Sequence, residues 1–142
     1  MSASSGIRNV ALAVLCAGMA SAMLSVLPAS AQRIDNPVAE FTGVDKITDR
    51  IITFDVYVGE TVQFGALQVT PRVCYSRPDT EEPRTDSFVE VDEITLDRKI
   101  RRIFTGWMFA ESPGLNAVEH GVYDVWLKGC KQDSEVPPPA TN

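Results

Sequence analysis

Ser112, His120 and Asp124 lie within thirteen residues of one another and have the side-chain types of a hydrolase triad. In such a triad the imidazole removes the serine proton and the carboxylate orients the imidazole, beside a preformed oxyanion hole. The G-x-S-x-G turn that exposes a nucleophilic serine is missing around Ser112. We therefore expect no catalytic residues; the alternative is a small hydrolase or carbohydrate-active enzyme that uses Ser112, His120 and nearby acids.

Metal binding is equally weakly indicated. His120 is the only histidine, and a stable metal site needs three or four converging ligands. The aspartates elsewhere in the chain lack the spacing of a calcium-binding loop. We expect neither a metal nor a cofactor.

The polar residues between 111 and 121 are better explained as a binding surface. Ser112 is a good helix N-cap and Pro113 suits the first helical position, so the segment predicts a short capped connection between two strands. Connections held on a rigid scaffold often carry function. The candidate surface consists of Glu111, Ser112, Asn116, Glu119 and His120.

The first thirty-one residues have the pattern of a secretory signal peptide. Arg8 supplies a basic start, Val10 to Leu27 is almost wholly apolar, and Ala29 to Ala31 forms a small-residue cleavage site. We expect cleavage between Ala31 and Gln32. The 111 residues beyond this site contain no second long apolar span, and this length suits one domain.

The exported chain is acidic. It carries 12 basic and 19 acidic residues, a net charge of −7. Such a surface does not attract nucleic acid or anionic lipid, so we expect neither as a partner. An envelope protein is the partner class that remains open.

Two cysteines, Cys74 and Cys130, follow the predicted leader. An even number of cysteines in an exported chain predicts a disulfide. A metal site or a catalytic thiol has less support, because there is no C-x-x-C pair and His120 lies ten residues from Cys130.

Apolar and polar residues alternate with a period of two over much of the chain, as in half-buried strands. This pattern predicts an all-β antiparallel fold of about seven strands, a small sandwich or barrel, with one short helical turn near residues 113–120. The expected strands are 39–46, 52–58, 61–64, 67–75, 88–91, 100–110 and 122–130.

Pro71 interrupts one of these strands and predicts an edge position or a bulge, because proline cannot donate to a ladder. Cys74 and Cys130 both fall on the polar parity of their strands. Either the bridge lies on the outer face of the sheet, or bulges near Pro71 and Gly129 turn it inward, which we favour.

A domain this small needs most of its aromatic side chains in the core, so we expect at most one or two to be exposed, with Trp126 the best candidate. The flanking segments are polar or proline-rich. We expect a loose lead-in outside the core at 32–38, a β domain at 39–131, and a disordered tail at 132–142.

Two blocks of sequence resemble a known family. They are FDVYVGETVQFGALQVTPRVCYSRP at 54–78 and FTGWMFAESPGLNAVEHGVYDVWLKGCK at 104–131. They are similar to exported bacterial proteins grouped as domain of unknown function 2155, found chiefly in alphaproteobacteria. The resemblance implies a Gram-negative envelope setting, hence the periplasm, and it carries no established activity, cofactor or catalytic residue. We expect a non-enzymatic binding or envelope accessory module; a structural envelope component is a further alternative.

Overall fold

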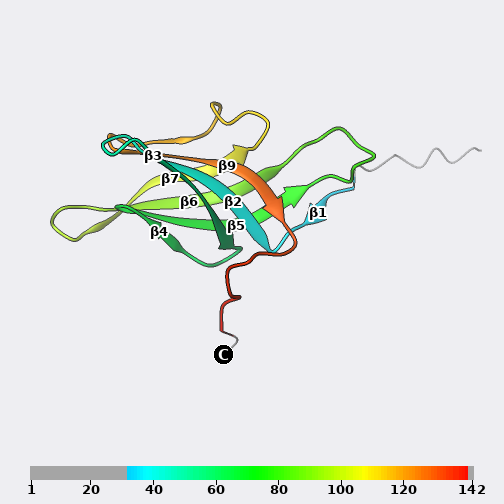
Figure 1. Cartoon of the computed structure of the whole chain (residues 1–142), viewed down its shortest axis with the longest axis horizontal. Helices are drawn as coiled ribbons and strands as arrows, with labels where there is room; N and C mark the ends of the chain where they lie inside the picture. The colour runs from blue at the N-terminus through cyan, green and yellow to red at the C-terminus, as the bar shows by residue number, and fades with distance from the viewer. Residues whose placement is uncertain (1–31, 141–142) are drawn as a thin grey trace, which may run out of the picture. The chain divides into compact units, whose positions relative to one another are not determined.

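The computed structural model describes residues 32–140, which form two antiparallel β-sheets (Figure 1). The strands are β1 (Ile34–Asp35), β2 (Val38–Asp45), β3 (Arg50–Tyr57), β4 (Val62–Phe64), β5 (Leu67–Ser76), β6 (Asp86–Ile94), β7 (Ile100–Phe109), β8 (Val118–Glu119) and β9 (Tyr123–Lys131). The first sheet has the order β1-β5-β6-β7, with β4 paired to the start of β5, and the second has the order β3-β2-β9-β8. The predicted signal peptide, residues 1–31, lies outside the described residues.

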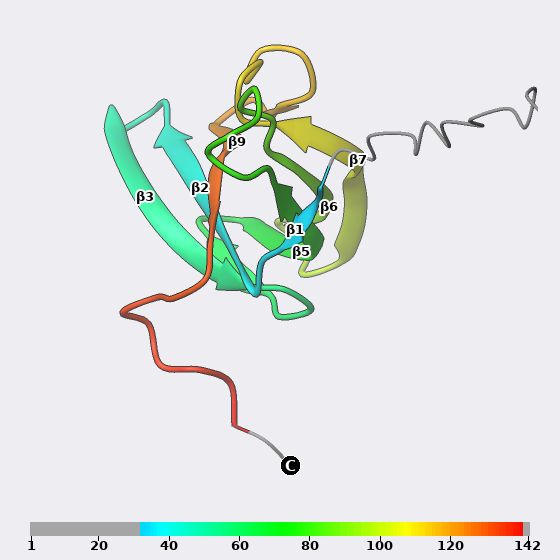
Figure 2. The same cartoon turned by 90° about the vertical axis from the view of Figure 1, so that its right-hand side faces the viewer.

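The two sheets face each other as the layers of a sandwich (Figure 2). Alternate residues of the long strands point into the space between them, which is the cause of the period-two pattern. Fully buried apolar residues come from both sheets: Val38, Ala39, Phe41, Val56, Leu67, Val69, Val89, Val91 and Val125. The predicted antiparallel all-β fold is confirmed, and because neither sheet closes on itself the architecture is a sandwich.

A disulfide between Cys74 on β5 and Cys130 on β9 joins the two sheets, with 5.8 Å between the Cα atoms. The ladder between β5 and β6 shifts register between Pro71 and Val73, which confirms the bulge predicted from the proline. The ladder between β2 and β9 also shifts, so that Lys128 is the extra residue. Both bulges precede a cysteine, and Cys74 is 1% exposed, so the bridge lies inside the sandwich.

The predicted helical turn near 113–120 is wrong. Residues 32–140 contain no helix, and therefore none long and apolar enough to cross a membrane. Residues 111–116 form turns with a hydrogen bond from Leu115 N to Ser112 O (3.0 Å), and Val118–Glu119 then pairs with β9 as strand β8. Gly114 lowers the helix propensity of this short segment. The backbone of Val118–Glu119 forms its hydrogen bonds with β9 instead.

The lead-in is more ordered than its polarity predicts. Residues 34–35 pair with β5, and Val38 is fully buried as the first residue of β2. The guanidinium of Arg33 lies 3.9 Å from the ring centroid of Tyr75, which stacks on Trp107 at 6.1 Å. Trp107, at 38% exposed, is the more open tryptophan, so the expectation for Trp126 is wrong.

Candidate functional site

The candidate surface lies on the connection between β7 and β9. Its first turn is held by a hydrogen bond from Ser112 N to Phe109 O (3.2 Å), and its last residues are held by β8 and by a bond from His120 N to Tyr123 O (2.9 Å). The side chain of Leu115 between these anchors is 68% exposed. The connection is thus fixed at both ends and presents an aliphatic side chain to solvent.

His120 joins the two sheets through its ring. Nε2 lies 2.8 Å from Oε1 of Glu93 on β6, and Nδ1 accepts a hydrogen bond from Val122 N at 3.0 Å. Because Nδ1 accepts, the proton of the neutral imidazole is on Nε2 and is donated to Glu93. The ring also stacks on Tyr123 at 5.6 Å, which fixes its orientation.

The hydrolase alternative receives no support from this geometry. Both ring nitrogens of His120 are bonded to groups other than Ser112 and Asp124. Asp124 instead lies 3.0 Å from Nζ of Lys46, and the same ammonium group donates to the carbonyl oxygen of His120 at 2.7 Å. A histidine that removes the proton of a serine needs a free ring nitrogen directed at that serine. His120 therefore has a structural role in this arrangement.

Glu93 carries the charge at this junction. It accepts hydrogen bonds from His120 and from Arg101 (2.7 Å), and these partners lower the pKa of its carboxyl below the ordinary value of 4.5, the histidine contributing most. The carboxylate accepts hydrogen bonds from Arg101 on β7 and from His120, which precedes β9. Glu93 therefore ties the candidate surface to the first sheet.

Glu93→Gln is expected to flatten the acid side of the stability profile. The folded-state pKa is lowered, so ionised Glu93 stabilises the fold above its ordinary pKa, and this contribution is lost as the pH falls through the folded-state pKa. Urea unfolding from about pH 6 to about pH 3 measures the effect. Glu60→Gln, at an exposed acid, is the matched control and should leave the profile unchanged. Equal acid slopes for Glu93→Gln and the unmodified protein contradict this role.

Two of the hollows beside the connection share a residue. The first, of about 680 Å³, lies between the connection and strands β6 and β7, and its lining includes Glu93, Arg101, Phe104, Leu115 and His120. The second, of about 520 Å³, lies between it and the 77–84 loop, and Leu115 lines this one as well. Leu115 is therefore the residue shared by both hollows.

The structure divides the predicted surface residues between these hollows. Glu119 and His120 line the first, and Glu111 and Ser112 line the second. Asn116 is exposed on the connection between them. Their role in binding stays a prediction. Among residues 32–140, no group of three histidine, cysteine or acidic side chains could hold a metal ion.

Sequence reasoning missed Glu93, Arg101 and Leu115. Glu93 and His120 are 27 residues apart and meet only because the two sheets stack, so no local pattern reports the contact. Leu115 had a signal, since it was an apolar residue in a polar connection. The turns of the connection leave its side chain in solvent.

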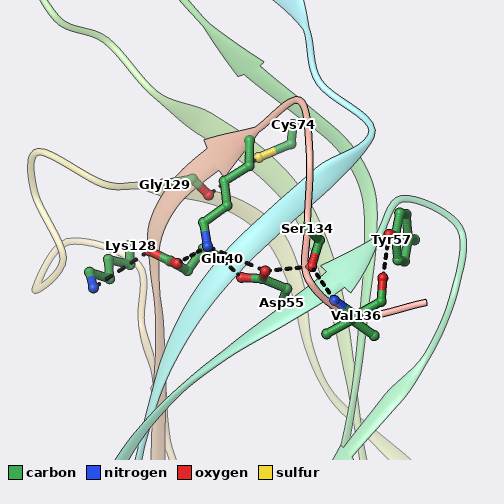
Figure 3. Close-up of polar contacts among 9 residues, drawn as sticks. Glu40, Asp55, Tyr57, Cys74, Lys128, Gly129, Ser134 and Val136 are labelled. Carbon is green, nitrogen blue, oxygen red and sulfur yellow. Dashed lines mark hydrogen bonds and ion pairs between the residues drawn. The ribbon is translucent and has the colours of Figure 1, made fainter. Parts of the chain in front are cut away.

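The opposite end of the second sheet carries a compensated charge cluster (Figure 3). The ammonium group of Lys131 contacts Glu40 and lies 3.1 Å from Asp55, and these two carboxylates, Glu40 first, raise the pKa of Lys131. Burial alone would raise the pKa of Asp55, but hydrogen bonds from Ser134 and Lys131 outweigh it and the net shift is downward. The charges satisfy one another, so this cluster is structural.

The start of the C-terminal tail lies against β3 beside this cluster. Ser134 Oγ donates to Asp55 (2.6 Å), and the Tyr57 hydroxyl donates to the carbonyl oxygen of Val136 (2.7 Å), as Figure 3 shows. Residues 132–140 form no strand or helix. The predicted disorder of the whole tail stays a prediction.

These features define an all-β sandwich whose two sheets are joined by a disulfide and, at the other end, by a glutamate–histidine contact. A family model described as "Uncharacterized protein conserved in bacteria (DUF2155)" matches residues 39–130. The chain belongs to this family. Both cysteines and all five candidate surface residues fall inside the matched range.

The chain is also similar to a curated bacterial protein. The chain is 25% identical over 87 residues to the uncharacterized protein RP359 of Rickettsia prowazekii (strain Madrid E). The alignment covers 61% of this chain and 56% of the relative, so the chain spans a little over half of the relative's length. No solved structure matches the chain.

Proposed function

We propose that this protein is an exported, non-enzymatic binding module of the bacterial envelope. Its binding surface is the 111–121 connection together with the two hollows that Leu115 lines. The observation that carries the proposal is Leu115, an aliphatic side chain that is 68% exposed on a connection anchored at both ends. Because the backbone is anchored on both sides of Leu115, little backbone entropy is lost when a partner covers its side chain.

Export is supported by the leader pattern and by the disulfide. An apolar stretch with a small-residue cleavage site precedes Gln32. Disulfides persist in oxidising compartments such as the periplasm and are rare in the cytosol. The Cys74–Cys130 bridge therefore fits a periplasmic protein better than a cytosolic one.

A polypeptide is the partner class that suits the surface best. The first hollow offers both signs of charge, with Glu93, Glu119 and Arg101 in its wall, next to the apolar Leu115 and Phe104. An apolar centre with a charged rim is the usual composition of a protein–protein interface. The hydrolase alternative is not carried further, because His120 is fully engaged by Glu93 and Val122.

Leu115→Glu is expected to abolish co-purification of the partner from envelope extract without lowering the melting temperature. The charge would be buried unpaired in the complex, whereas in the free protein the side chain stays in water. Ile47→Glu is the matched control, since Ile47 is 75% exposed on the turn between β2 and β3. Quantitative mass spectrometry of the bound proteins measures the difference.

Two outcomes contradict the proposed surface. If Leu115→Glu and Ile47→Glu retain the same partners, the 111–121 connection does not bind them. If the unmodified protein retains no partner and only its deletion weakens the envelope, the alternative of a purely structural component is favoured.

A further inference from the structure

His120 is the only histidine of the chain, and its ring closes the end of the 111–121 connection. Histidine is the side-chain type whose charge ordinarily changes between about pH 5 and pH 8. Each ring nitrogen has one bonded partner, Glu93 on one side and the backbone of Val122 on the other. These two partners respond differently to a second proton on the ring.

Charged and titratable side chains surround the ring on every element packed against it. They are Glu93 on β6, Arg101 on β7, Glu119 on β8, Tyr123 and Asp124 on β9, and Lys46 in the turn after β2. Lys46 pairs with Asp124 at 3.0 Å, and Arg101 pairs with Glu93 at 2.7 Å. All of these side-chain types ordinarily titrate outside the range from about pH 5 to about pH 8. The ring is therefore the group whose charge changes in that range.

Two contacts hold the ring in place in both charge states. Nε2 lies 2.8 Å from Oε1 of Glu93, and protonation of the ring strengthens this contact because both partners are then charged. The hydrogen bond from His120 is also the largest cause of the lowered pKa of Glu93, so the carboxylate stays ionised beside the ring. On one side the ring stacks on Tyr123, with 5.6 Å between the centroids. The ring therefore remains on Glu93 when it takes up a proton.

The contact with Val122 does not survive protonation. In the neutral ring Nδ1 accepts a hydrogen bond from Val122 N at 3.0 Å. The second proton of the charged ring is carried by Nδ1, so that one donor then faces another. Turning the ring over does not help, because it replaces Nδ1 by Cδ2 and Nε2 by Cε1 and so loses Glu93 as well. The amide group of Val122 must move away.

The peptide between Gly121 and Val122 is the part of the connection that can respond. Gly121 is exposed, and nothing lies within 4 Å of the position that a Cβ would take there. The backbone is held on both sides, since His120 N donates to Tyr123 O (2.9 Å) and Lys46 N donates to Val122 O (2.8 Å). Glycine adopts more backbone conformations than other residues, so this peptide can turn between the two anchors. His120 and Gly121 both line the first hollow, so its wall changes with the peptide.

We propose that His120 is a pH-dependent latch: the neutral ring holds the end of the 111–121 connection through Val122, and the protonated ring releases it while remaining on Glu93. The effect on binding rests on the function proposed above. A connection held at its end loses less entropy when a partner covers it, so the neutral form binds more tightly. The loss of one hydrogen bond should weaken partner binding roughly threefold to tenfold between about pH 7.5 and about pH 5.5.

Nuclear magnetic resonance of the unmodified protein tests the latch without any partner. The scalar coupling between the nitrogens of Val122 and His120 Nδ1, transmitted through the hydrogen bond, should be present at about pH 8 and absent at about pH 5. The Val122 amide should shift with the same midpoint as the ring protons, whereas the amide of Val125, within the β8–β9 ladder, should not. A missing coupling at about pH 8, or a Val122 amide that does not follow the ring, overturns the inference.

Two substitutions of His120 separate its two contacts. His120→Asn places a side-chain oxygen where Nδ1 lies, so an acceptor for Val122 N persists at every pH. His120→Gln reaches towards Glu93 instead and leaves Val122 N without that acceptor. Retention of the partner from envelope extract should therefore be equal at about pH 7.5 and about pH 5.5 for both variants, high for His120→Asn and low for His120→Gln.

The retention experiment also distinguishes the latch from the proposed function. If the unmodified protein retains its partner equally at both pH values, or if His120→Asn loses it as steeply as the unmodified protein does, the latch does not control binding. If no partner is retained at either pH, the proposed function fails, and the coupling between Val122 and His120 still decides whether the latch exists.

Discussion

Replacing Cys74 and Cys130 by serine is expected to lower the free energy of unfolding by about 4 kcal/mol, a large share of the stability of a domain of this size. The two residues are 56 positions apart, and without the bridge the unfolded chain regains the freedom of a long loop. In the folded state the bridge joins β5 to β9, so its loss also removes the covalent link between the sheets. Urea unfolding at neutral pH measures the change.

Reduction of the unmodified protein is the internal control for this prediction. Dithiothreitol should produce the same loss of stability in the unmodified protein and no loss in the double serine variant. Cys74 is buried, so the reductant should act mainly through unfolding and reduction should be slow under native conditions. A loss below about 1 kcal/mol in the serine variant contradicts the structural role assigned to the bridge.

Gly65→Ala is expected to cost about 3 kcal/mol, the second-largest effect. Gly65 has φ +57°, a left-handed conformation that costs an alanine about 1–2 kcal/mol. A Cβ there would also overlap the ring of Tyr123, which stacks on His120 and contacts Phe64. Relief of that overlap must displace Tyr123 and adds about 1–3 kcal/mol.

Gly59→Ala separates the two contributions. Gly59 also has a positive φ, +86°, but nothing lies within 4 Å of the position of its Cβ. It should therefore cost only the backbone term, about 1–2 kcal/mol, and leave the environment of Tyr123 unchanged. Equal losses for Gly59→Ala and Gly65→Ala, measured by urea unfolding, contradict the proposed close packing of Gly65 on the tyrosine.

The need for glycine at position 65 follows from the aromatic packing beside it and cannot be read from the sequence alone. Phe41, Phe54, Phe64 and Tyr123 form a continuous series with ring centroids 5.5–5.8 Å apart. The series ends on His120, so the core reaches the candidate surface through side-chain contacts. The sequence shows the aromatic residues, but it does not show that the ring of Tyr123 packs against Gly65, 58 positions earlier, where a side chain would not fit.

Local patterns predicted the elements that local physics determines. Alternation of apolar residues located the long strands, Pro71 predicted the bulge, and the cysteine count predicted the bridge. The alternation alone placed Cys74 on the polar face of its strand. The bulge between Pro71 and Val73 explains why the cysteine is buried instead. Features that depend on which strands become neighbours were beyond such patterns.

The connection between β7 and β9 shows the limit most clearly. Ser112 and Pro113 are typical of a helix start, yet pairing of Val118–Glu119 with β9 prevails over that local preference. The contact of His120 with Glu93 also requires the stacked sheets. The five candidate residues lie on one connection because they are close in sequence, and their role in binding stays a prediction. The groups that hold them in place, such as Glu93, were not predicted.

The most direct test of the proposed function is crosslinking in intact cells, with a photoreactive amino acid at position 115 of the full chain and, as control, at position 47. We expect a periplasmic protein that begins at Gln32 and forms an adduct with another polypeptide from position 115 but not from position 47. An unprocessed cytosolic protein, equal adducts from both positions, or no adduct from either would contradict it.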